Sequence, residues 1–317
     1  MAKILVTGSQ GVIGQWLVEK LKSRGHYVFG ADLAHGIGEI GYTQRMTHTD
    51  FTYSRCDISE YRQIERVLEL HDFDYVYNCA AEFGRWNGED FYEQAWKSNV
   101  IGLKHILRLQ EKLGFRLIHF SSSEVYGDYT DIMYESVMDD LEIKQLNDYA
   151  LTKWTNEQQI ANSRTMNSTE TVIVRIFNTY GPGEYYHPYR SVNSKFCYNL
   201  LTGNKIDLYS GHSRTSTYLE DSVTTISNIC ENFKDGSVYN IGGADLHTIE
   251  ELVEIILKKT EVSRELVNVI NHEEMMTTKH KLVDISKSIT DLDHKNSVSL
   301  IDGVSRTIDW MREVYRV

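Results

Sequence analysis

Short apolar runs alternate with longer amphipathic stretches through the first half of the chain. Short runs rich in β-branched residues are typical of buried strands, whereas apolar residues three and four positions apart predict helices. Such a regular alternation is the pattern of a doubly wound parallel sheet that helices cover on both faces. The strands are expected at 3–7, 28–32, 51–57, 75–81, 116–123 and 171–178, and the helices at 13–24, 59–70, 91–112 and 146–163.

The pattern becomes irregular beyond residue 180, where the aromatic and turn-rich stretch YGPGEYYHPY holds both prolines of the chain. We therefore expect a first α/β domain at 1–178 and a smaller C-terminal α/β substrate lobe at 179–317, interleaved with the first. In this second part, helices are expected at 192–202, 221–232, 248–259 and 301–315, and short strands near 206–209, 216–219 and 238–242.

Composition narrows the class of protein. The 317 residues are 41% hydrophobic and 25% charged, as in ordinary globular proteins, and the net charge of −12 argues against nucleic acid as a partner. No apolar stretch is long enough to span a membrane, and the chain enters a strand pattern directly, so no signal peptide is expected. The four cysteines lie far apart and no histidine stands at metal-ligand spacing, which predicts a cytoplasmic protein with reduced thiols and no metal site.

A glycine-rich turn follows the first predicted strand. The stretch TGSQGVIG (7–14) carries Gly8, Gly11 and Gly14 between a strand and a helix, where glycine permits a tight turn and a helix N-terminus attracts a pyrophosphate. Asp32 ends the second strand, where an acid accepts hydrogen bonds from an adenosine ribose and repels a 2′-phosphate. This context predicts a Rossmann domain that binds NAD, although Asp32 as a solvated turn residue is the alternative. Asp57 is either an adenine contact or a helix cap.

A tyrosine and a lysine stand four residues apart in a predicted helix. Tyr149 and Lys153 therefore share one helix face, and an ammonium beside a phenol favours the phenolate that a general base requires. A serine at the end of the preceding strand (SSS, 121–123) would share the proton between the tyrosine and a substrate oxygen. A tyrosine–lysine pair alone is common, but its combination with the glycine loop and Asp32 is specific.

These motifs make the chain similar to the extended short-chain dehydrogenase/reductase family, in particular its NAD-dependent nucleotide-sugar epimerases, dehydratases and decarboxylases. The similarity covers nearly the whole chain, and the later stretches at 177–191 and 212–221 resemble most a 5,6-dehydratase of the tunicamycin type. It implies transient oxidation of a sugar carbon, usually C4, by a tightly held NAD. The motifs that carry it are TGSQGVIG, NCAAE (78–82), SNVIG (98–102), FSSSEVYGD (120–128), YALTK (149–153), RIFNTYGPG (175–183) and RTSTYLED (214–221).

The resemblance also assigns roles residue by residue. Tyr149 would be the base, Lys153 would hold the nicotinamide ribose, Ser122 would bind the sugar hydroxyl, and Asn99 would be structural. It further implies a homodimer through the helices near 91–112 and 146–163. The implied cofactor contacts are Gly8, Gln10, Gly11, Val12, Ile13, Gly14, Asp32, Asp57, Ile58, Ala80, Ala81, Tyr149 and Lys153. The implied substrate contacts are Glu82, Arg85, Ser123, Asn178, Arg214 and Lys281, for a nucleotide-diphosphate sugar with a UDP-sugar favoured.

Glu124 separates the possible reactions. In the family's 4,6-dehydratases the positions of Ser123 and Glu124 hold an acid for the leaving hydroxyl and a base for C5. This chain keeps the base and lacks the acid, so UDP-glucuronate decarboxylation and 4-epimerisation are alternatives to dehydration. A surface acid on the turn is the structural alternative for Glu124, and a lid or an oligomer contact is the alternative for Arg85. Net NAD-dependent sugar dehydrogenation or reduction is a further possibility, and a catalytically silent NAD-sensing protein is disfavoured by the intact Ser122, Tyr149 and Lys153.

Overall fold

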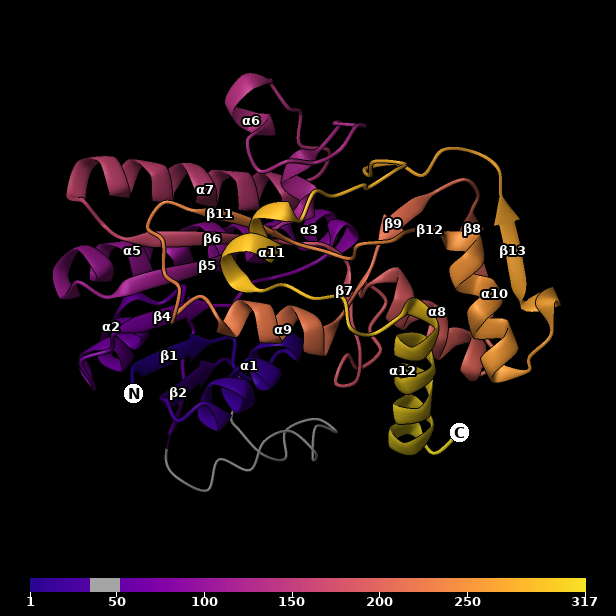
Figure 1. Cartoon of the computed structure of the whole chain (residues 1–317), viewed down its shortest axis with the longest axis horizontal. Helices are drawn as coiled ribbons and strands as arrows, with labels where there is room; N and C mark the ends of the chain where they lie inside the picture. Colours follow the sequence, from indigo (N-terminus) through magenta and orange to yellow (C-terminus); the bar gives the residue numbers. More distant parts are fainter. Residues whose placement is uncertain (35–51) are drawn as a thin grey trace.

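The computed structural model describes residues 1–34 and 52–317 (Figure 1), so the first residue of the strand expected at 51–57 lies outside the described part. Its main element is a seven-stranded sheet in which every neighbouring pair of strands is parallel. The order is β11-β6-β5-β4-β1-β2-β3, so the direction of winding reverses between β1 and β4. The strands are β1 (Lys3–Thr7), β2 (Tyr27–Asp32), β3 (Tyr53–Arg55), β4 (Tyr75–Asn78), β5 (Arg116–Ser122), β6 (Thr171–Ile176) and β11 (Val238–Ile241).

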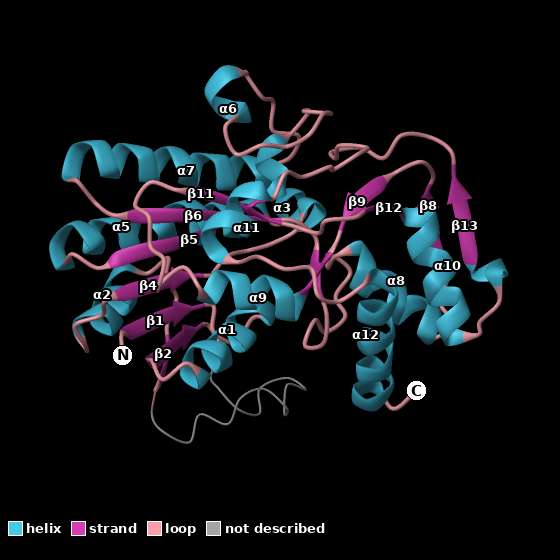
Figure 2. Ribbon diagram, in the orientation of Figure 1, coloured by secondary structure: helices cyan, strands magenta, loops and turns pink. Residues whose placement is uncertain are grey.

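Helices cover both faces of this sheet because successive side chains of each strand point to opposite sides. In β1, Ile4 and Val6 are buried against α1 (Val12–Ser23), α9 (Leu219–Ser227) and α11 (Ser286–Leu292). Leu5 is buried on the opposite face against α2 (Tyr61–Glu69), α5 (Gly102–Leu113) and α7 (Asp148–Asn167). The apolar runs of the sequence thus form the two-sided core of a doubly wound fold, and Figure 2 shows the helices that cover the two faces of the sheet.

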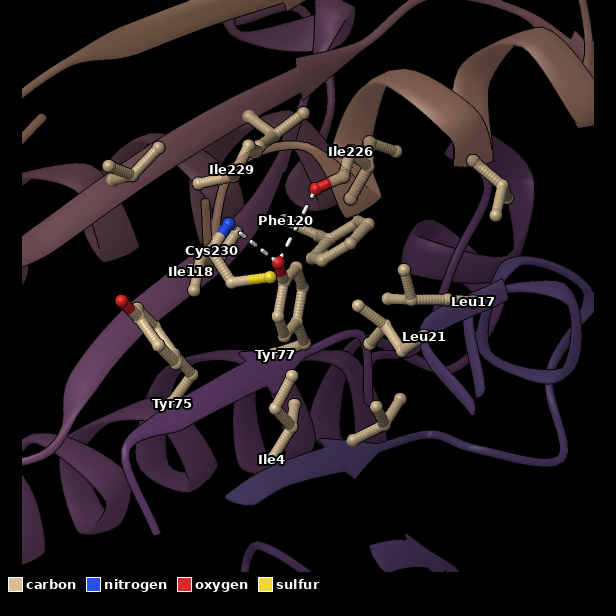
Figure 3. Close-up of a cluster of buried hydrophobic side chains, with 14 of the residues drawn as sticks. Ile4, Leu17, Leu21, Tyr75, Tyr77, Ile118, Phe120, Ile226, Ile229 and Cys230 are labelled. Atoms are coloured by element: carbon tan, nitrogen blue, oxygen red, sulfur yellow. Dashed lines mark hydrogen bonds between the residues drawn. The ribbon is translucent and has the colours of Figure 1, made fainter. Parts of the chain in front are cut away.

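One buried aromatic residue shows how this core tolerates a polar atom. Tyr77 of β4 is fully buried beneath α9, and its hydroxyl donates to the carbonyl of Ile226 at 3.4 Å (Figure 3). The same oxygen accepts a hydrogen bond from the backbone N–H of Cys230 at 3.2 Å. The buried hydroxyl thus has the hydrogen-bond partners that a buried polar group needs. These partners are backbone groups at the end of α9 and just beyond it.

The C-terminal third forms a second cluster of elements beside the sheet (Figure 1). Its apolar core lies between α8, α10, α12 and the paired strands β8 and β13. Segments of the same third return to the first domain, because β11 pairs with β6 and α9 and α11 pack on the sheet. This return supports the proposed interleaving, and the boundary at residue 178 stays a prediction. The elements are α8 (Val192–Leu201), β8 (Ile206–Tyr209), α10 (Ile249–Thr260), β13 (Val267–Ile270) and α12 (Leu300–Tyr315), with the short strands β7 (Thr179–Tyr180), β9 (Ser213–Thr215), β10 (Thr217–Tyr218) and β12 (Leu246–Thr248).

The predicted fold class is confirmed, but several predicted elements differ in detail. The expected helix 91–112 is divided into α4 (Tyr92–Ala95), a π-helical turn (Trp96–Ile101) and α5. Asn99 lies in that π turn and ties two segments together, since its Oδ1 accepts from the Glu82 N–H at 2.8 Å and its Nδ2 donates to Thr152 Oγ1 at 3.0 Å. The expected strand 75–81 ends at Asn78. None of the helices in the described part is long and apolar enough to cross a lipid bilayer.

Candidate active site

The glycine loop joins β1 to α1 at the carboxyl edge of the sheet, beside the reversal of strand order where such folds bind ligands. Gly8 has a φ of +66°, and a Cβ there would stand 2.7 Å from the backbone nitrogen of Ala80. A Cβ on Gly14 would stand 2.1 Å from the carbonyl oxygen of Gly8. Neither position accepts a side chain, so the loop can lie close against both β4 and the start of α1.

A cavity of about 400 Å³ opens above this loop. Asp32 stands at its rim, where its carboxylate accepts the N–H of Gln10 at 2.8 Å and the N–H of Ala34 at 3.2 Å. Asp57 does not cap α2, whose N-cap is Glu60; its Oδ1 accepts from the N–H and the hydroxyl of Ser59 in the preceding turn, and the residue lines the cavity wall. All the predicted cofactor contacts line this one cavity: Gly8, Gln10, Gly11, Val12, Ile13, Gly14, Asp32, Asp57, Ile58, Ala80, Ala81, Tyr149 and Lys153.

Tyr149 and Lys153 lie in the first turns of α7, whose start is fixed by Asn147. The Asn147 side chain accepts the N–H of Ala150 at 2.8 Å, which is a regular N-cap. The ammonium of Lys153 donates to the carbonyl of Phe120 at 2.8 Å and lies 5.8 Å from the centroid of the Tyr149 ring. The helix therefore holds both side chains against the end of β5, next to Ser122.

The electrostatics of this pair correct one expectation. Burial raises the pKa of Tyr149 to about 12, a hydrogen bond with Ser122 opposes the rise, and the charge of Glu124 adds to it. Burial also lowers the pKa of Lys153 to about 8. The expected lowering of the Tyr149 pKa by Lys153 is therefore not found, because burial, which raises that pKa, is the largest effect on it.

Glu124 lies on the 3₁₀ turn (Ser123–Tyr126) after β5 and is not a surface acid. Its carboxylate forms an ion pair with the ammonium of Lys281, whose side chain is 3% exposed. Burial tends to raise the pKa of Glu124, but the positive charges of Lys281, Arg85 and Arg214 outweigh burial and hold that pKa below its usual value. At neutral pH Glu124 is therefore an ionised carboxylate surrounded by cations.

A second cavity of about 730 Å³ lies between the sheet and the C-terminal lobe. Five of the predicted substrate residues line it, namely Arg85, Ser123, Asn178, Arg214 and Lys281. Glu82 does not, since it lines the smaller cavity and accepts a hydrogen bond from Asn87 at 3.1 Å. Arg85 pairs with Glu274 at 2.8 Å in the wall of this cavity, and Lys281 pairs with Glu124. The carboxylate partner of Lys281 argues against its use as the second phosphate cation.

Sequence reasoning did not single out several polar residues of the larger cavity. Lys195 of α8 lies in the segment 183–196 that the resemblance assigns to the nucleotide-diphosphate site, but Lys205, Tyr209 at the end of β8, and His212 were missed; all four line the wall. Lys195 carried a weak signal, since a lone cation interrupts the apolar face of a helix, and burial lowers its pKa. The other three carried none, because short strands and turns of this lobe have no periodicity that marks a binding face. Within the described residues no group of histidine, cysteine and acidic side chains is arranged to hold a metal ion.

The two cavities meet at a small group of shared residues. Ser122 and Tyr149 line both cavities, whereas Lys153 lines only the smaller and Glu124 only the larger. The smaller cavity fits NAD, since a glycine loop without room for side chains supplies the phosphate cradle and Asp32 stands where a ribose would lie. The reactive hydroxyls thus stand between a dinucleotide site and a larger polar site.

Comparison with known proteins agrees with this arrangement. The profile of the NAD dependent epimerase/dehydratase family matches residues 4–242. Protein CapI of Staphylococcus aureus is 27% identical over an alignment 340 residues long, gaps included, that covers 99% of each chain. UDP-N-acetyl-alpha-D-glucosaminuronate decarboxylase of Bacillus cytotoxicus is 27% identical over 98% of each chain. Among solved structures, UDP-glucuronic acid 4-epimerase of Bacillus cereus in complex with NAD is 26% identical, with a TM-score of 0.83 over 99% of each chain.

The profile match covers the glycine loop, the Tyr149–Lys153 helix, Glu124 and Arg214, so it spans most of both cavity walls. The predicted family and its cofactor are thereby confirmed. The chain is an enzyme of the NAD-dependent epimerase/dehydratase family.

Proposed function

We propose that this enzyme converts a nucleoside-diphosphate sugar, with a UDP-sugar favoured, by transient oxidation at C4 and proton chemistry at C5. One observation carries the proposal: Ser122 and Tyr149 stand at the junction of the two cavities, and Glu124 faces only the larger one. A sugar in the larger cavity would place its ring between the phenol and the carboxylate. A simple alcohol dehydrogenase needs the phenol and has no use for the carboxylate.

Each residue then has a defined task. Tyr149 takes the proton of the C4 hydroxyl, Ser122 hydrogen-bonds the same oxygen, and Lys153 fixes the nicotinamide ribose. Bound NAD would supply the hydride acceptor and, in its oxidised form, a positive charge. That charge favours the phenolate, which the buried protein groups alone disfavour. A carbonyl at C4 acidifies the C5 proton, and the ionised Glu124 stands ready to remove it.

The diphosphate of the substrate would bind on the side of the larger cavity that the C-terminal lobe forms. Arg214 is buried in the middle of β9; burial lowers its pKa to about 10, and it still carries its positive charge at neutral pH. We propose that Arg214 and Lys195 hold the two phosphates, with Arg214 offering the bidentate geometry. Lys195 replaces Lys281 in this proposal, because Lys281 is engaged by Glu124.

A decarboxylase is the second candidate, and a specific observation favours it. Three cations, Lys281, Arg85 and Arg214, contribute to the electrostatics of Glu124, and such a cluster would also attract the C6 carboxylate of a uronic acid. The Bacillus cytotoxicus relative carries the name of a uronate decarboxylase. Loss of carbon dioxide needs no acid at a leaving hydroxyl, which agrees with Ser123 at the position of the missing acid.

The experiment is incubation with a panel of UDP-, dTDP- and GDP-sugars in deuterated water, read by mass spectrometry and NMR. Loss of water indicates dehydration, loss of carbon dioxide indicates decarboxylation, and an unchanged mass with altered ring couplings indicates epimerisation. Incorporation of deuterium at C5 measures proton removal by Glu124 and should disappear in Glu124→Gln. The control variant Glu142→Gln, on the exposed surface, should retain it. Undiminished C5 exchange in Glu124→Gln would remove the base assignment. Consumption of free NAD in proportion to product would instead indicate net dehydrogenation.

We also propose that the enzyme is a cytoplasmic homodimer. Large apolar side chains stand exposed along the helices that the resemblance implies as the interface, with Phe91 at 53%, Ile101 at 48% and Leu151 at 40% of full exposure. All four cysteines are free, which suits a reducing compartment. Light scattering at several concentrations tests the dimer, and Ile101→Lys together with Leu151→Lys should shift it to the monomer.

A further inference from the structure

Elimination at a sugar ring needs both a base and an acid, and this site has an evident base only. The position before Glu124 is Ser123, which cannot supply a proton readily at neutral pH. The other carboxyl groups in the wall of the larger cavity each have a partner within the protein; among them Glu184 lines both cavities, and burial raises its pKa. Glu184 accepts from the Ser191 hydroxyl at 3.0 Å, Asp207 accepts from Asn268 at 2.8 Å, and Glu274 pairs with Arg85 at 2.8 Å.

Lys281 reaches this part of the cavity from a segment more than 150 residues away in sequence. Its backbone N–H donates to the carbonyl of Ser213 at 3.1 Å, and the neighbouring Leu282 carbonyl accepts the N–H of Met133 at 2.8 Å. These bonds fix the segment on both sides. The Lys281 side chain is buried, contacts the Glu124 carboxylate and lines the same cavity as Ser122 and Tyr149.

The charges around Lys281 suit a group that gives up a proton. Burial lowers its pKa to about 8, Glu124 opposes that effect, and Arg214 and Arg85 add to it. These three side chains, from the 3₁₀ turn, β9 and α3 (Arg85–Asp90), are the charged groups that face the ammonium. At neutral pH the pair is therefore an ammonium beside a carboxylate. An arginine in this place would keep its proton, because a guanidinium does not deprotonate in proteins.

We infer that Lys281 is the acid of the reaction, donating a proton to the departing C6 oxygen of a nucleoside-diphosphate hexose. The inference rests on the proposed function, because it requires a C4 carbonyl and C5 deprotonation. Glu124 takes the C5 proton, and the electrons of the C5–H bond form a C5=C6 double bond. The C6–O bond breaks, and its oxygen leaves as water with a proton from Lys281. The step yields one water, a protonated Glu124 and a neutral Lys281 amine.

The direct contact between the two side chains closes the cycle. A protonated carboxyl group and a neutral amine in contact exchange a proton to restore the carboxylate–ammonium pair. The same proton that leaves C5 thus replaces the one given to the leaving oxygen, and no solvent proton is required. A buried ion pair that contributes little to stability by itself has a chemical use in this position.

The test compares Lys281→Arg with wild type in deuterated water, on a nucleotide hexose that the wild-type enzyme dehydrates. Lys281→Arg keeps the positive charge next to Glu124 but cannot give its proton. We expect C5 deuterium exchange to persist and water loss to fall by about 100-fold or more, which is the contribution of a general acid. Lys279→Arg is the matched control, since Lys279 lies two residues away, is exposed and lines neither cavity.

A substrate with fluorine in place of the C6 hydroxyl separates acid catalysis from other roles. Fluoride leaves without a proton, so Lys281→Arg should eliminate it within about tenfold of the wild-type rate while water loss stays impaired. Retained C5 exchange in the same sample shows that the variant is folded and binds both ligands. This combination of outcomes supports the assignment.

Other outcomes overturn it. Near-normal water loss in Lys281→Arg would show that Lys281 contributes only its positive charge and donates no proton. The proposed function would remain intact. Loss of C5 exchange and of fluoride elimination together makes Lys281 a positioning residue for Glu124. If the wild-type enzyme releases carbon dioxide and no water, the substrate is a uronate with no leaving hydroxyl at C6, and Lys281 is not the acid of a dehydration. A wild-type enzyme that shows no C5 exchange with any sugar overturns the proposed C5 chemistry and this assignment with it.

Discussion

The ion pair between Glu157 and Arg175 connects the helix of Tyr149 to the sheet and offers a sharp test of the fold. Arg175 of β6 donates to Glu157 of α7 through Nε at 3.1 Å and Nη2 at 2.8 Å, and both side chains are at most 5% exposed. The Ser121 hydroxyl donates to the same carboxylate at 2.5 Å. Glu157→Gln keeps the shape of the side chain and removes the charge that neutralises the guanidinium.

The expected cost follows from what remains around Arg175 after this change. The guanidinium keeps hydrogen bonds to the Tyr126 hydroxyl and the Glu135 carbonyl, each at 2.9 Å, but it has no buried counter-charge. Removing one partner of a buried pair typically costs about 3–5 kcal/mol, because the remaining ion is desolvated without compensation. We expect the free energy of unfolding to fall by that amount.

Urea unfolding followed by tryptophan fluorescence measures this change, with an unaltered dependence on urea concentration as a check on the transition. Glu60→Gln is the control, since its partner Lys97 is 56% exposed and the pair is screened by solvent. Adding Arg175→Met to Glu157→Gln should recover part of the loss, because the orphaned charge is removed. A loss below about 1 kcal/mol for Glu157→Gln would refute the argument from burial.

The remaining predictions concern the cofactor and the proton chemistry. Tyr149→Phe should lower turnover by about 100-fold or more while NAD is still bound, as measured by steady-state rates and cofactor content after purification; near-normal turnover would remove the base assignment. Gly14→Ala should abolish NAD binding in a calorimetric titration, because the new Cβ would overlap the Gly8 carbonyl; retained affinity would contradict the loop geometry. Lys153 has its pKa lowered by burial from 10.5 to about 8, so the unfolded state binds more protons between these pH values and this residue's contribution to stability rises with pH there. Wild type should therefore gain stability relative to Lys153→Met as the pH is raised from 8 to 10 in unfolding experiments; a constant difference would show that the ammonium is not desolvated.

Much of the cofactor half was predictable because its signals are local. The glycine spacing, the strand and helix that flank it, and the acid at the end of β2 lie within 32 residues of each other, and the fold brings them to one edge. The pair Tyr149–Lys153 was predictable for the same reason, since four residues of helix set their relation. The roles assigned to these residues stay predictions, as does the narrower resemblance to a 5,6-dehydratase.

Boundaries and short elements were predicted less well. The π turn at Trp96–Ile101 follows the same apolar pattern as a continuous helix, and only the contacts of Asn99 with the loop after β4 show why an extra residue is accommodated. Helix α11 and strands β9, β12 and β13 were missed. They are too short for their periodicity to stand out, and their stability comes from neighbours distant in sequence.

The sequence by itself determined the alternating α/β architecture, the NAD loop and the tyrosine–lysine helix, since each depends on residues close together in the chain. Only the tertiary structure decided that Glu124 pairs with Lys281, that the wall of the larger cavity includes Lys195 and His212, and that Glu82 lies in the cofactor cavity instead. It also decided that burial, and not the nearby ammonium, dominates the pKa of Tyr149. Desolvation and long-range ion pairs arise from the packing of distant segments, and no local pattern of residues encodes them.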